Sequence, residues 1–388
     1  MEVRLISDPD GFARLKSAWS ALYERHTPRS PFLAHEWFEA AWRWRKDSAR
    51  MRIFACWRAE QLVGVMPLVV DGADESSGRH RTLEFLAVPD TQTCDVLADA
   101  GDRRAVASAI ADELVRRRRE WDSISFRHLP RGALTATELR EALSRHGLRC
   151  EVIQATSNPW IALESTWAVY YASRSRRLKK AINLAQNRLA KAGTVALRRL
   201  AADQMDPTEI RRWLDRITAI SAKSWKNRTG NSLNHDGPNA FLCCLAEQAP
   251  CRHWLSIWEL SLNEQPVAME LQLVDGGDIF ALRSDFDASY DALSAGSHLN
   301  RLMLEQLFGR GFRRYLMGPG ENPYKYRWAD DAEPVATMTV YGTTLRGQWH
   351  AARDLMLKPA MRRIRDRLRP PESADAANPQ PDAEAKQR

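Results

Sequence analysis

The sequence predicts a mixed α/β (α+β) protein built from two similar halves, and three observations support this prediction. Segments with the apolar spacing of amphipathic helices alternate with short runs typical of strands. The same order of elements occurs twice: helices, an antiparallel strand pair, a strand, a helix and a further strand. The 388 residues also suffice for two domains of ordinary size. We therefore expect two mixed, mostly antiparallel sheets, each flanked by helices.

The first half is expected to cover residues 1–160. Its expected helices are 10–25, 36–45, 105–120 and 137–146, and its expected strands are 52–57, 62–70, 82–87, 123–128 and 150–155. The last helix stops before Gly147, which suits a helix C-cap. The strand candidates at 52–57 and 62–70 lie close enough in the sequence to form an antiparallel pair.

The second half is expected to cover residues 161–350 and to repeat this order. Its expected helices are 166–192, 207–226, 239–248 and 297–309, and its expected strands are 195–200, 254–262, 267–274, 279–283 and 315–317. A basic C-terminal helix is expected at 351–369. The tail at 370–388 has the Pro, Ala and acidic content of a disordered segment.

The composition favours a cytoplasmic protein without a metal site. Hydrophobic residues make up 44% and charged residues 27%, as in soluble globular proteins. No run approaches the roughly 18 apolar residues of a membrane helix, and charges interrupt the N-terminus, so we expect neither membrane insertion nor a signal peptide. The group Cys243, Cys244, Cys251 and His253 lacks the regular ligand spacing of a zinc site. The sequence does not determine the oligomeric state.

The net charge of +8 suits an anionic partner, such as a nucleotide, a nucleic acid or an acidic lipid surface, but it does not choose among them. A basic surface without a dedicated partner explains the same charge. The strongest basic run is residues 174–191. This run is either a phosphate- or tRNA-binding face or a solvated helix face, and it lacks the interleaved aromatic residues of an RNA platform.

The segment "DALSAGSHLN" at 291–300 places a Ser-Ala-Gly turn directly before an apolar-periodic helix. The N-terminus of a helix has unpaired N–H groups and a positive dipole end, so it readily binds phosphate. Ser294 is also an ordinary helix N-cap residue type. The motif alone leaves both interpretations open.

Several motifs occur in a shared order around this turn. They are "SPFLAHEWFEAAW" (30–42), "LVGVMPL" (62–68), "SRSRRLKKAINLAQNRLAKAG" (173–193), "SAKSWKNRTGNSL" (221–233), Gln265-Pro266-Val267-Ala268, Phe286-Asp287 with Tyr290, Ser294-Ala295-Gly296, and Tyr324-Lys325-Tyr326-Arg327-Trp328. Together they resemble the GNAT-type acetyltransferase family related to the cellulose-biosynthesis protein CelD. The FemABX aminoacyltransferases are more distant relatives.

The resemblance implies a tandem GNAT-like fold and an enzyme that moves an acyl group, usually acetyl, from acetyl-CoA or another acyl-CoA to an amine. The amine would belong to a small molecule or a polysaccharide precursor, bound in the cleft between the halves. The second half would hold the donor, with a donor-binding set of Arg283, Ser294, Ala295, Gly296, Ser297 and His298.

Three residues are the catalytic candidates under this resemblance. Lys325 lies between two tyrosines that can desolvate its ammonium, unless it is a surface lysine beside core aromatics. Asp287 either orders the loop before the helix or polarises the acceptor, and it is also a common turn residue. Tyr290 either protonates the leaving group or only packs. His298 is a further candidate base, although a lone histidine is more often a surface or core residue.

Two rival functions remain open. An aminoacyl-tRNA-dependent ligase would use the same cleft and need a tRNA surface. A catalytically degenerate scaffold is favoured by Leu316, which stands where many relatives have Asp. Ala295 also replaces the usual Pro of the family motif.

Overall fold

The computed structural model describes residues 1–71, 80–201 and 206–357, and its central feature is one continuous mixed sheet. The sheet has 13 strands in the order β1-β2-β3-β4-β6-β13-β7-β12-β11-β10-β9-β8, with β5 paired to β3. The strands are β1 (Glu2–Ile6), β2 (Ala49–Arg58), β3 (Gln61–Asp71), β4 (Thr82–Phe85), β5 (Leu97–Ala98), β6 (Ser123–Leu129), β7 (Arg149–Ala162), β8 (Val195–Ala201), β9 (Leu255–Leu262), β10 (Gln265–Asp275), β11 (Asp278–Phe286), β12 (Arg314–Leu316) and β13 (Asp331–Tyr341).

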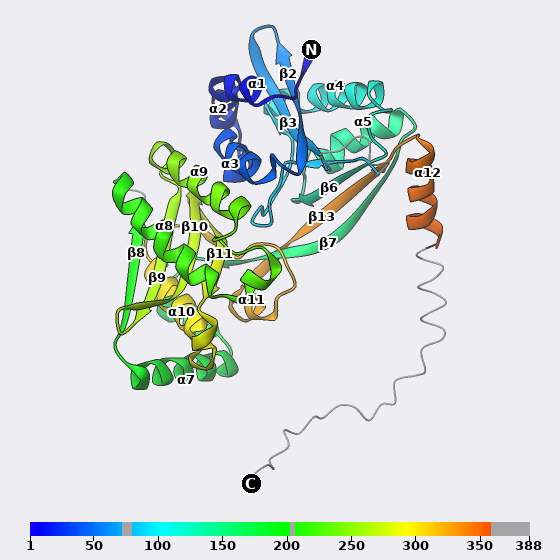
Figure 1. The fold of residues 1–388 in the computed structure, drawn as a ribbon. Helices are drawn as coiled ribbons and strands as arrows, with labels where there is room; N and C mark the ends of the chain where they lie inside the picture. Colours follow the sequence, from blue (N-terminus) through cyan, green and yellow to red (C-terminus); the bar gives the residue numbers. More distant parts are fainter. Residues whose placement is uncertain (72–79, 202–205, 358–388) are drawn as a thin grey trace, which may run out of the picture.

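Helices cover both faces of this sheet (Figure 1). They are α1 (Pro9–Arg14), α2 (Lys16–Arg25), α3 (His35–Arg45), α4 (Arg103–Arg116), α5 (Arg140–Arg145), α6 (Trp167–Ser173), α7 (Arg176–Ala192), α8 (Pro207–Ala222), α9 (Asp236–Arg252), α10 (Ala295–Leu307), α11 (Pro323–Trp328) and α12 (Leu345–Ala352). The mixed α/β fold class predicted from the sequence is confirmed. Two expected helices are each divided: 10–25 becomes α1 and α2, and 166–192 becomes α6 and α7.

The two halves repeat one strand order. In the first half, β1, β2, β3 and β4 are antiparallel neighbours, and β6 then runs parallel to β4. In the second half, β8, β9, β10 and β11 are antiparallel neighbours, and β12 runs parallel to β11. A helix links the parallel strands in each case, α4 in the first half and α10 in the second. The predicted internal duplication therefore holds at the level of topology.

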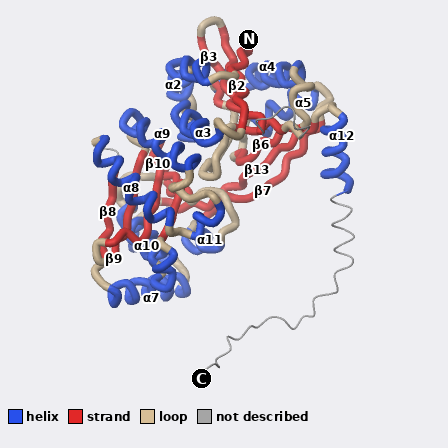
Figure 2. Tube along the Cα trace, viewed as in Figure 1, coloured by secondary structure: helices blue, strands red, loops and turns tan. Residues whose placement is uncertain are grey.

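The halves exchange their last strands, and this corrects the expectation of two separate sheets. Strand β13, from the end of the second half, lies between β6 and β7 and pairs antiparallel with both. Strand β7, from the end of the first half, pairs with β12 of the second half through residues 160–162. Figure 2 shows the strands continuing from one half into the other through β7 and β13. Because β13 joins the sheet of the first half, the sheet does not divide at residue 160. The predicted domain boundary at residue 160 therefore remains a prediction.

Three apolar cores hold the molecule together. One lies between the halves, where α3 packs on α9 and the buried side chains include Trp19, Trp37 and Phe241. A second lies under α4 and α5. The third lies between α7, α10 and the sheet of the second half. Because the first core is shared by both halves, neither half buries its own apolar residues alone.

The C-terminal prediction is only partly described. The expected helix at 351–369 begins earlier, as α12 at Leu345, and continues as a π-helical turn at Arg353–Leu357. The remainder of that helix and the tail at 370–388 lie outside the described residues. Across the described chain, no helix has the length and apolar character needed to cross a membrane.

Candidate active site

A cavity opens in the second half where two parallel strands separate. Strand β11 pairs with β12 only over Asp278–Phe280 and Arg314–Leu316, and β11 then continues to Phe286 while β12 ends. The diverging strands enclose about 570 Å³. The lining residues used below are Lys226, Arg283, Ser284, Asp285, Gly296, Ser297, Tyr315, Met317, Tyr324 and Lys325. This gap between strands can admit an extended substrate alongside the free edge of β11.

The N-terminus of α10 borders this cavity through Gly296 and Ser297. Ser294 adopts the left-handed conformation, with φ 55° and ψ 42°, and within the described structure its side chain makes no capping hydrogen bond. The N–H groups of the first helical turn have no acceptor within the helix, so they favour an anion at this end. The ordinary Ser N-cap interpretation is therefore wrong for Ser294.

Glu270 lies directly behind the cavity wall, on β10, and is almost fully buried. One carboxylate oxygen accepts hydrogen bonds from the Tyr315 hydroxyl at 2.6 Å and the Gln272 amide at 2.7 Å. The other accepts from the Ser284 hydroxyl at 2.7 Å. Burial raises the pKa of Glu270, while these hydrogen bonds and the nearby Lys325 act to lower it. A buried carboxylate of this kind can exchange protons with groups in the cavity.

Lys325 is a cation near enough to this carboxylate to lower its pKa. Its ammonium donates to the carbonyls of Gly318 at 2.8 Å and Pro319 at 3.3 Å. Burial and the neighbouring Lys226 lower the pKa of Lys325 to about 8, and Glu270 partly offsets them. Gly318 and Gly320 both have positive φ, at 81° and 130°, which allows the chain to turn so that the carbonyls meet the ammonium.

An ion pair between Lys226 and Asp285 closes another side of the cavity. Lys226 lies 2.6 Å from a carboxylate oxygen of Asp285 and donates to the Ser284 carbonyl at 3.0 Å. Asp285 also accepts from the Ser221 hydroxyl at 2.7 Å. Lys226 follows Ser224, whose side chain caps a short 3-10 helix at Trp225–Thr229. This network fixes the position of the end of β11.

The first half reaches the edge of the cavity through the loop after β4. Gln92 donates to the carbonyl of Ala281 at 2.8 Å and accepts from Asn158 at 3.4 Å. Asp90 pairs with Arg283 at 2.7 Å, and Arg283 also donates to the Asn231 side chain. Arg283 therefore joins the two halves at the border of the site.

This part of the chain is similar to a known protein family. Residues 174–326 match a family model described as an acetyltransferase (GNAT) domain. We use the name "GNAT domain" for this matched stretch, residues 174–326. No curated protein matches the sequence. The narrower relation to CelD remains a prediction.

Solved structures share the fold of nearly the whole chain. The structure titled FemX is 11% identical with a TM-score of 0.54, over 92% of this chain and 100% of that chain. The C-terminal domain of a putative lysylphosphatidylglycerol synthetase from Agrobacterium fabrum is 11% identical with a TM-score of 0.53, over 90% and 97%. A protein of unknown function from Bacteroides thetaiotaomicron has 11% identity and a TM-score of 0.51, over 88% and 100%. At these identities the similarity shows the fold alone.

The structure brings together part of the predicted site. Lys325, Arg283, Gly296 and Ser297 line the cavity of the GNAT domain. Ser294 and Ala295 precede them at the start of α10. The candidate roles of these residues remain predictions.

The other candidates are Asp287, Tyr290 and His298, and the structure shows what each of them contacts. Asp287 accepts hydrogen bonds from Ser289 at 2.6 and 3.0 Å and lies 3.3 Å from Lys223. Burial opposes ionisation of Asp287, but these contacts lower its pKa, so it remains a charged cap of the turn at Ala288–Leu293. Tyr290 packs against the apolar core of the GNAT domain. His298 is buried, which lowers its pKa, and it is not among the described residues that line the cavity.

Leu316 faces away from the cavity. Side chains alternate along β12, so Tyr315 and Met317 line the cavity while Leu316 belongs to the core between the halves. A carboxylate at position 316 would therefore not point into this site. The buried carboxylate near Lys325 is Glu270.

Sequence reasoning did not identify Glu270, Ser284, Tyr315 or Lys226. A signal was present in the stretch "VAMELQLV", where Glu270 and Gln272 interrupt an otherwise apolar strand at alternate positions. Polar residues two apart lie on the same face of a strand. Their burial predicts a polar network, which the structure contains as the hydrogen bond from Gln272 to Glu270.

The corresponding gap in the first half is smaller. Strands β4 and β6 separate around about 240 Å³, and Arg45 crosses this region to pair with Glu84 at 2.8 Å. Arg45 also donates to the Ala87 carbonyl at 3.1 Å. Within the described part of the first half, this gap lacks a lysine among its lining residues. The difference between the two cavities favours the GNAT domain of the second half as the location of the candidate active site.

No group of described His, Cys, Asp and Glu side chains is arranged to hold a metal ion. Cys243 and Cys244 lie on α9, and the Cys251 side chain is outside the described set. Burial raises the pKa of the Cys244 thiol to about 11, so this group is a neutral core residue.

Proposed function

We propose that the protein is an N-acyltransferase that moves an acyl group, in the first instance acetyl, from acyl-CoA to an amine of a small molecule or polysaccharide precursor. The observation that carries this proposal is the cavity of the GNAT domain, where Lys325 and the hydrogen-bonded pair Ser284–Glu270 meet beside the start of α10. The amine and polysaccharide parts of the proposal rest on the sequence resemblance.

The donor would bind along the diverging end of β11. Its pyrophosphate would lie at the first turn of α10, where Gly296 and Ser297 line the cavity and backbone N–H groups are available. Its thioester would then extend toward Tyr315 and Lys325. Loop residues of the first half, including Gln92 at Ala281, border the route by which the acceptor would enter.

In the proposed reaction the amine nitrogen attacks the thioester carbonyl, a carbon–nitrogen bond forms, and the carbon–sulfur bond breaks. The amine proton passes to Glu270 through the Ser284 hydroxyl, which already donates to that carboxylate at 2.7 Å. The Lys325 ammonium stabilises the oxyanion and then protonates the thiolate. Its pKa of about 8 is close to that of an ordinary thiol, about 8.5, so this last transfer is nearly balanced.

Glu270→Gln tests this assignment because it keeps the shape of the side chain and removes the proton acceptor. We expect the affinity for CoA, measured by calorimetry, to stay within about twofold and the turnover of acetyl-CoA with a competent amine to fall about 100-fold. Unchanged turnover would exclude Glu270 as the proton acceptor. Failure of the wild-type protein to bind CoA or acetyl-CoA would contradict the donor assignment itself.

A second candidate donor is an aminoacyl-tRNA, and one observation favours it. The basic helix α7 packs beside α10. Arg188 of α7 donates to the Ala292 carbonyl at 3.0 Å, and Ala292 lies just before the first turn of α10, where the donor would bind. Arg176, Arg177 and Lys180 are exposed on the same helix. Binding of aminoacyl-tRNA, together with lack of binding to CoA, would favour this donor over acyl-CoA.

A further inference from the structure

Two lysines line the candidate active site, and their ammonium groups are held in different ways. Lys226 lies 2.6 Å from a carboxylate oxygen of Asp285, whose side chain is fully buried. Lys325 instead donates to two uncharged backbone carbonyls, of Gly318 at 2.8 Å and of Pro319 at 3.3 Å. The same cavity therefore contains one lysine in a close ion pair and one lysine held by peptide groups.

This difference decides which lysine can act as a nucleophile, because an ammonium group has no lone pair. Removing the proton of Lys226 would leave the buried Asp285 carboxylate without its counter-charge, which is costly. Burial and the neighbouring Lys226 lower the pKa of Lys325 to about 8, and Glu270 partly offsets them. At pH 7 about a tenth of the Lys325 side chains are therefore neutral amines.

The next step rests on the proposed function, in which the Lys325 ammonium stabilises the oxyanion of the donor thioester. A donor to that oxygen lies about 3 Å from it, so the carbonyl carbon lies within about 4 Å of the Lys325 nitrogen. Two groups held this close react far faster than the same groups free in solution. The neutral form of Lys325 is thus a nucleophile placed beside an activated acyl group.

We propose that Lys325 is a self-acylation site, whose side-chain nitrogen takes the acyl group from bound acyl-CoA when no amine acceptor occupies the cavity. The neutral nitrogen attacks the thioester carbonyl, a carbon–nitrogen bond forms, and the carbon–sulfur bond breaks. The proton that the nitrogen loses passes to the departing thiolate, so CoA leaves as a thiol. The step needs no reactant besides acyl-CoA.

Self-acylation switches the proposed reaction off. The amide formed at Lys325 has no charge, so it cannot stabilise an oxyanion as an ammonium does or protonate a thiolate. An amide is also a much poorer acyl donor than a thioester, so the modified lysine is not an intermediate on the way to the acceptor. The protein therefore loses activity when the donor is abundant and the acceptor is scarce.

Incubation of the full chain with deuterium-labelled acetyl-CoA tests this proposal, with the label located by peptide mass spectrometry. We expect Lys325 to gain the label at least about tenfold faster than Lys226 or the exposed Lys191. The rate at Lys325 should rise with pH and level off above about 8. Excess CoA should slow labelling of Lys325 because it occupies the donor site, and a competent amine should slow it by competing for the acyl group.

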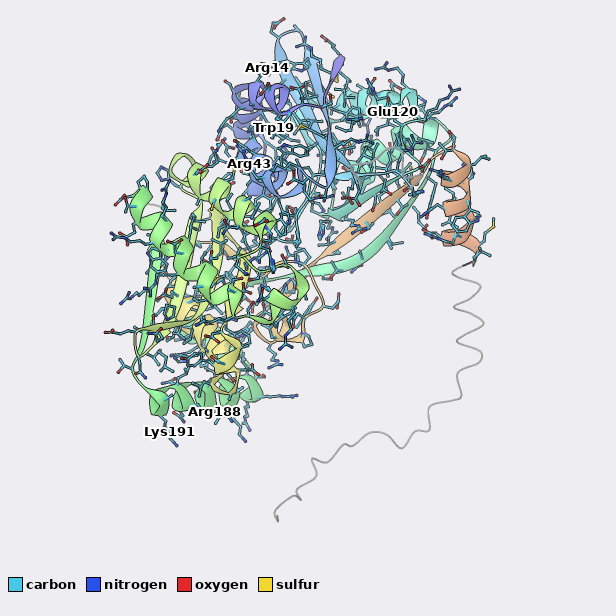
Figure 3. The ribbon with its side chains drawn as sticks, viewed as in Figure 1. Arg14, Trp19, Arg43, Glu120, Arg188 and Lys191 are labelled. Carbon is cyan, nitrogen blue, oxygen red and sulfur yellow. The ribbon has the colours of Figure 1, made fainter. Side chains whose placement is uncertain are left out.

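Two variants and an unfolded sample serve as controls. Lys325→Arg keeps a positive charge and should lose the fast labelling, whereas Lys191→Arg should keep it. Figure 3 shows Lys191 at the outer end of α7. In urea the advantage of Lys325 should disappear, since it depends on the folded cavity. The wild-type peptide map locates the label directly, so the test does not depend on the folding of a variant.

The outcomes separate this inference from the proposed function. Labelling of Lys226 or Lys191 as fast as Lys325 would overturn the self-acylation site, and so would a rate at Lys325 that excess CoA leaves unchanged. Binding of acetyl-CoA by calorimetry with no label at Lys325 at about pH 9 would overturn self-acylation alone. A wild-type protein that does not bind acetyl-CoA would overturn the donor assignment, and the self-acylation site with it.

Discussion

Burial gives ordinary side chains unusual proton affinities in the candidate active site. Glu270 is held by three hydrogen bonds, from Tyr315, Gln272 and Ser284. Lys325 is held by two backbone carbonyls and is repelled by Lys226. The opposite shifts of the two pKa values bring a proton acceptor and a proton donor toward the pH at which an amine is acylated.

The pKa of Lys325 makes the reaction rate depend on pH. If the ammonium form acts, kcat/KM should fall as the pH rises through about 8. Lys325→Met should reduce kcat/KM at pH 7 by about 100-fold and abolish this dependence. Rates measured from pH 6 to 10 with wild type, Lys325→Met and the exposed control Lys191→Met test this. A control with the same loss as Lys325→Met would contradict the role of Lys325.

The same pKa predicts a change of stability with pH. The folded-state pKa of Lys325, about 8, lies below its ordinary value of 10.5, so the unfolded chain binds more protons between these values. The free energy of unfolding contributed by Lys325 should therefore be lowest below about pH 8 and rise from pH 8 to 10.5. Urea unfolding should show that Lys325→Met lacks this rise, which is on the order of 2 kcal/mol after allowance for partial exposure. An identical pH dependence in both proteins would contradict the lowered pKa.

Arg283 connects the halves through a buried ion pair. Its side chain is 0% exposed and lies 2.7 Å from Asp90. Arg283→Met leaves the Asp90 carboxylate buried without its partner, so we expect the free energy of unfolding to fall by about 3–5 kcal/mol. Arg283→Met/Asp90→Asn should recover part of that loss. Denaturant unfolding measures both variants, and a loss below about 1 kcal/mol would indicate a pair that water screens.

At the scale of elements, the start of α10 lacks a side-chain cap, because Ser294 makes no capping hydrogen bond in the described structure. A helix normally satisfies some of its first N–H groups with a side chain, so this end remains able to bind an anion. The divergence of β11 from β12 places that end at the cavity. The two elements together define the proposed donor site.

Gly296→Val tests this element. A Cβ at Gly296 would lie 3.5 Å from Phe286, an ordinary contact, so the fold can accept a side chain here, while Val adds bulk at a residue that lines the cavity. We expect at least about a tenfold loss of CoA affinity by calorimetry, with a stability cost of about 1 kcal/mol or less. Gly101→Val is the matched control, since a Cβ at Gly101 meets no atom within 4 Å. Unchanged CoA affinity in Gly296→Val would mean that the donor phosphates bind elsewhere.

At the scale of the whole molecule, strand exchange and a shared core make the two halves one folding unit. Strand β13 fills the space between β6 and β7, and α3 packs on α9 across the boundary. Each half therefore depends on residues that are distant in the sequence. Acyl transfer would benefit because the loop of the first half is held against the GNAT domain by Asp90 and Arg283.

A chain that ends at residue 330 lacks β13 and should not fold cooperatively. Without β13, the facing edges of β6 and β7 would be unpaired, and the apolar side chains that pack against β13 would be exposed to water. The full chain should unfold in a single transition by both tryptophan fluorescence and far-UV circular dichroism. A chain that ends at residue 369 is the control and should match the full chain. Independent cooperative folding of fragments 1–160 and 161–350 would contradict the prediction.

The sequence by itself determined the elements whose side chains follow a local period. The apolar spacing of α10 and the alternation of β9 and β10 gave their positions within a few residues, and the repeated order predicted the duplicated topology. Strand β13 was missed because Pro334 and nearby charges weaken its local strand pattern, and its pairing partners are far away in the sequence.

Only the tertiary structure decided which residues form the site. Glu270 and Lys325 belong to different elements, and their proximity depends on how β10, β12 and α11 pack. Leu316 was considered because many relatives have Asp at this position. The alternation of side chains along β12 instead directs Leu316 into the core between the halves. Local periodicity records which face of an element avoids water. It does not record which distant elements share a cavity, because that is set by the pairing of strands and the burial of side chains throughout the chain.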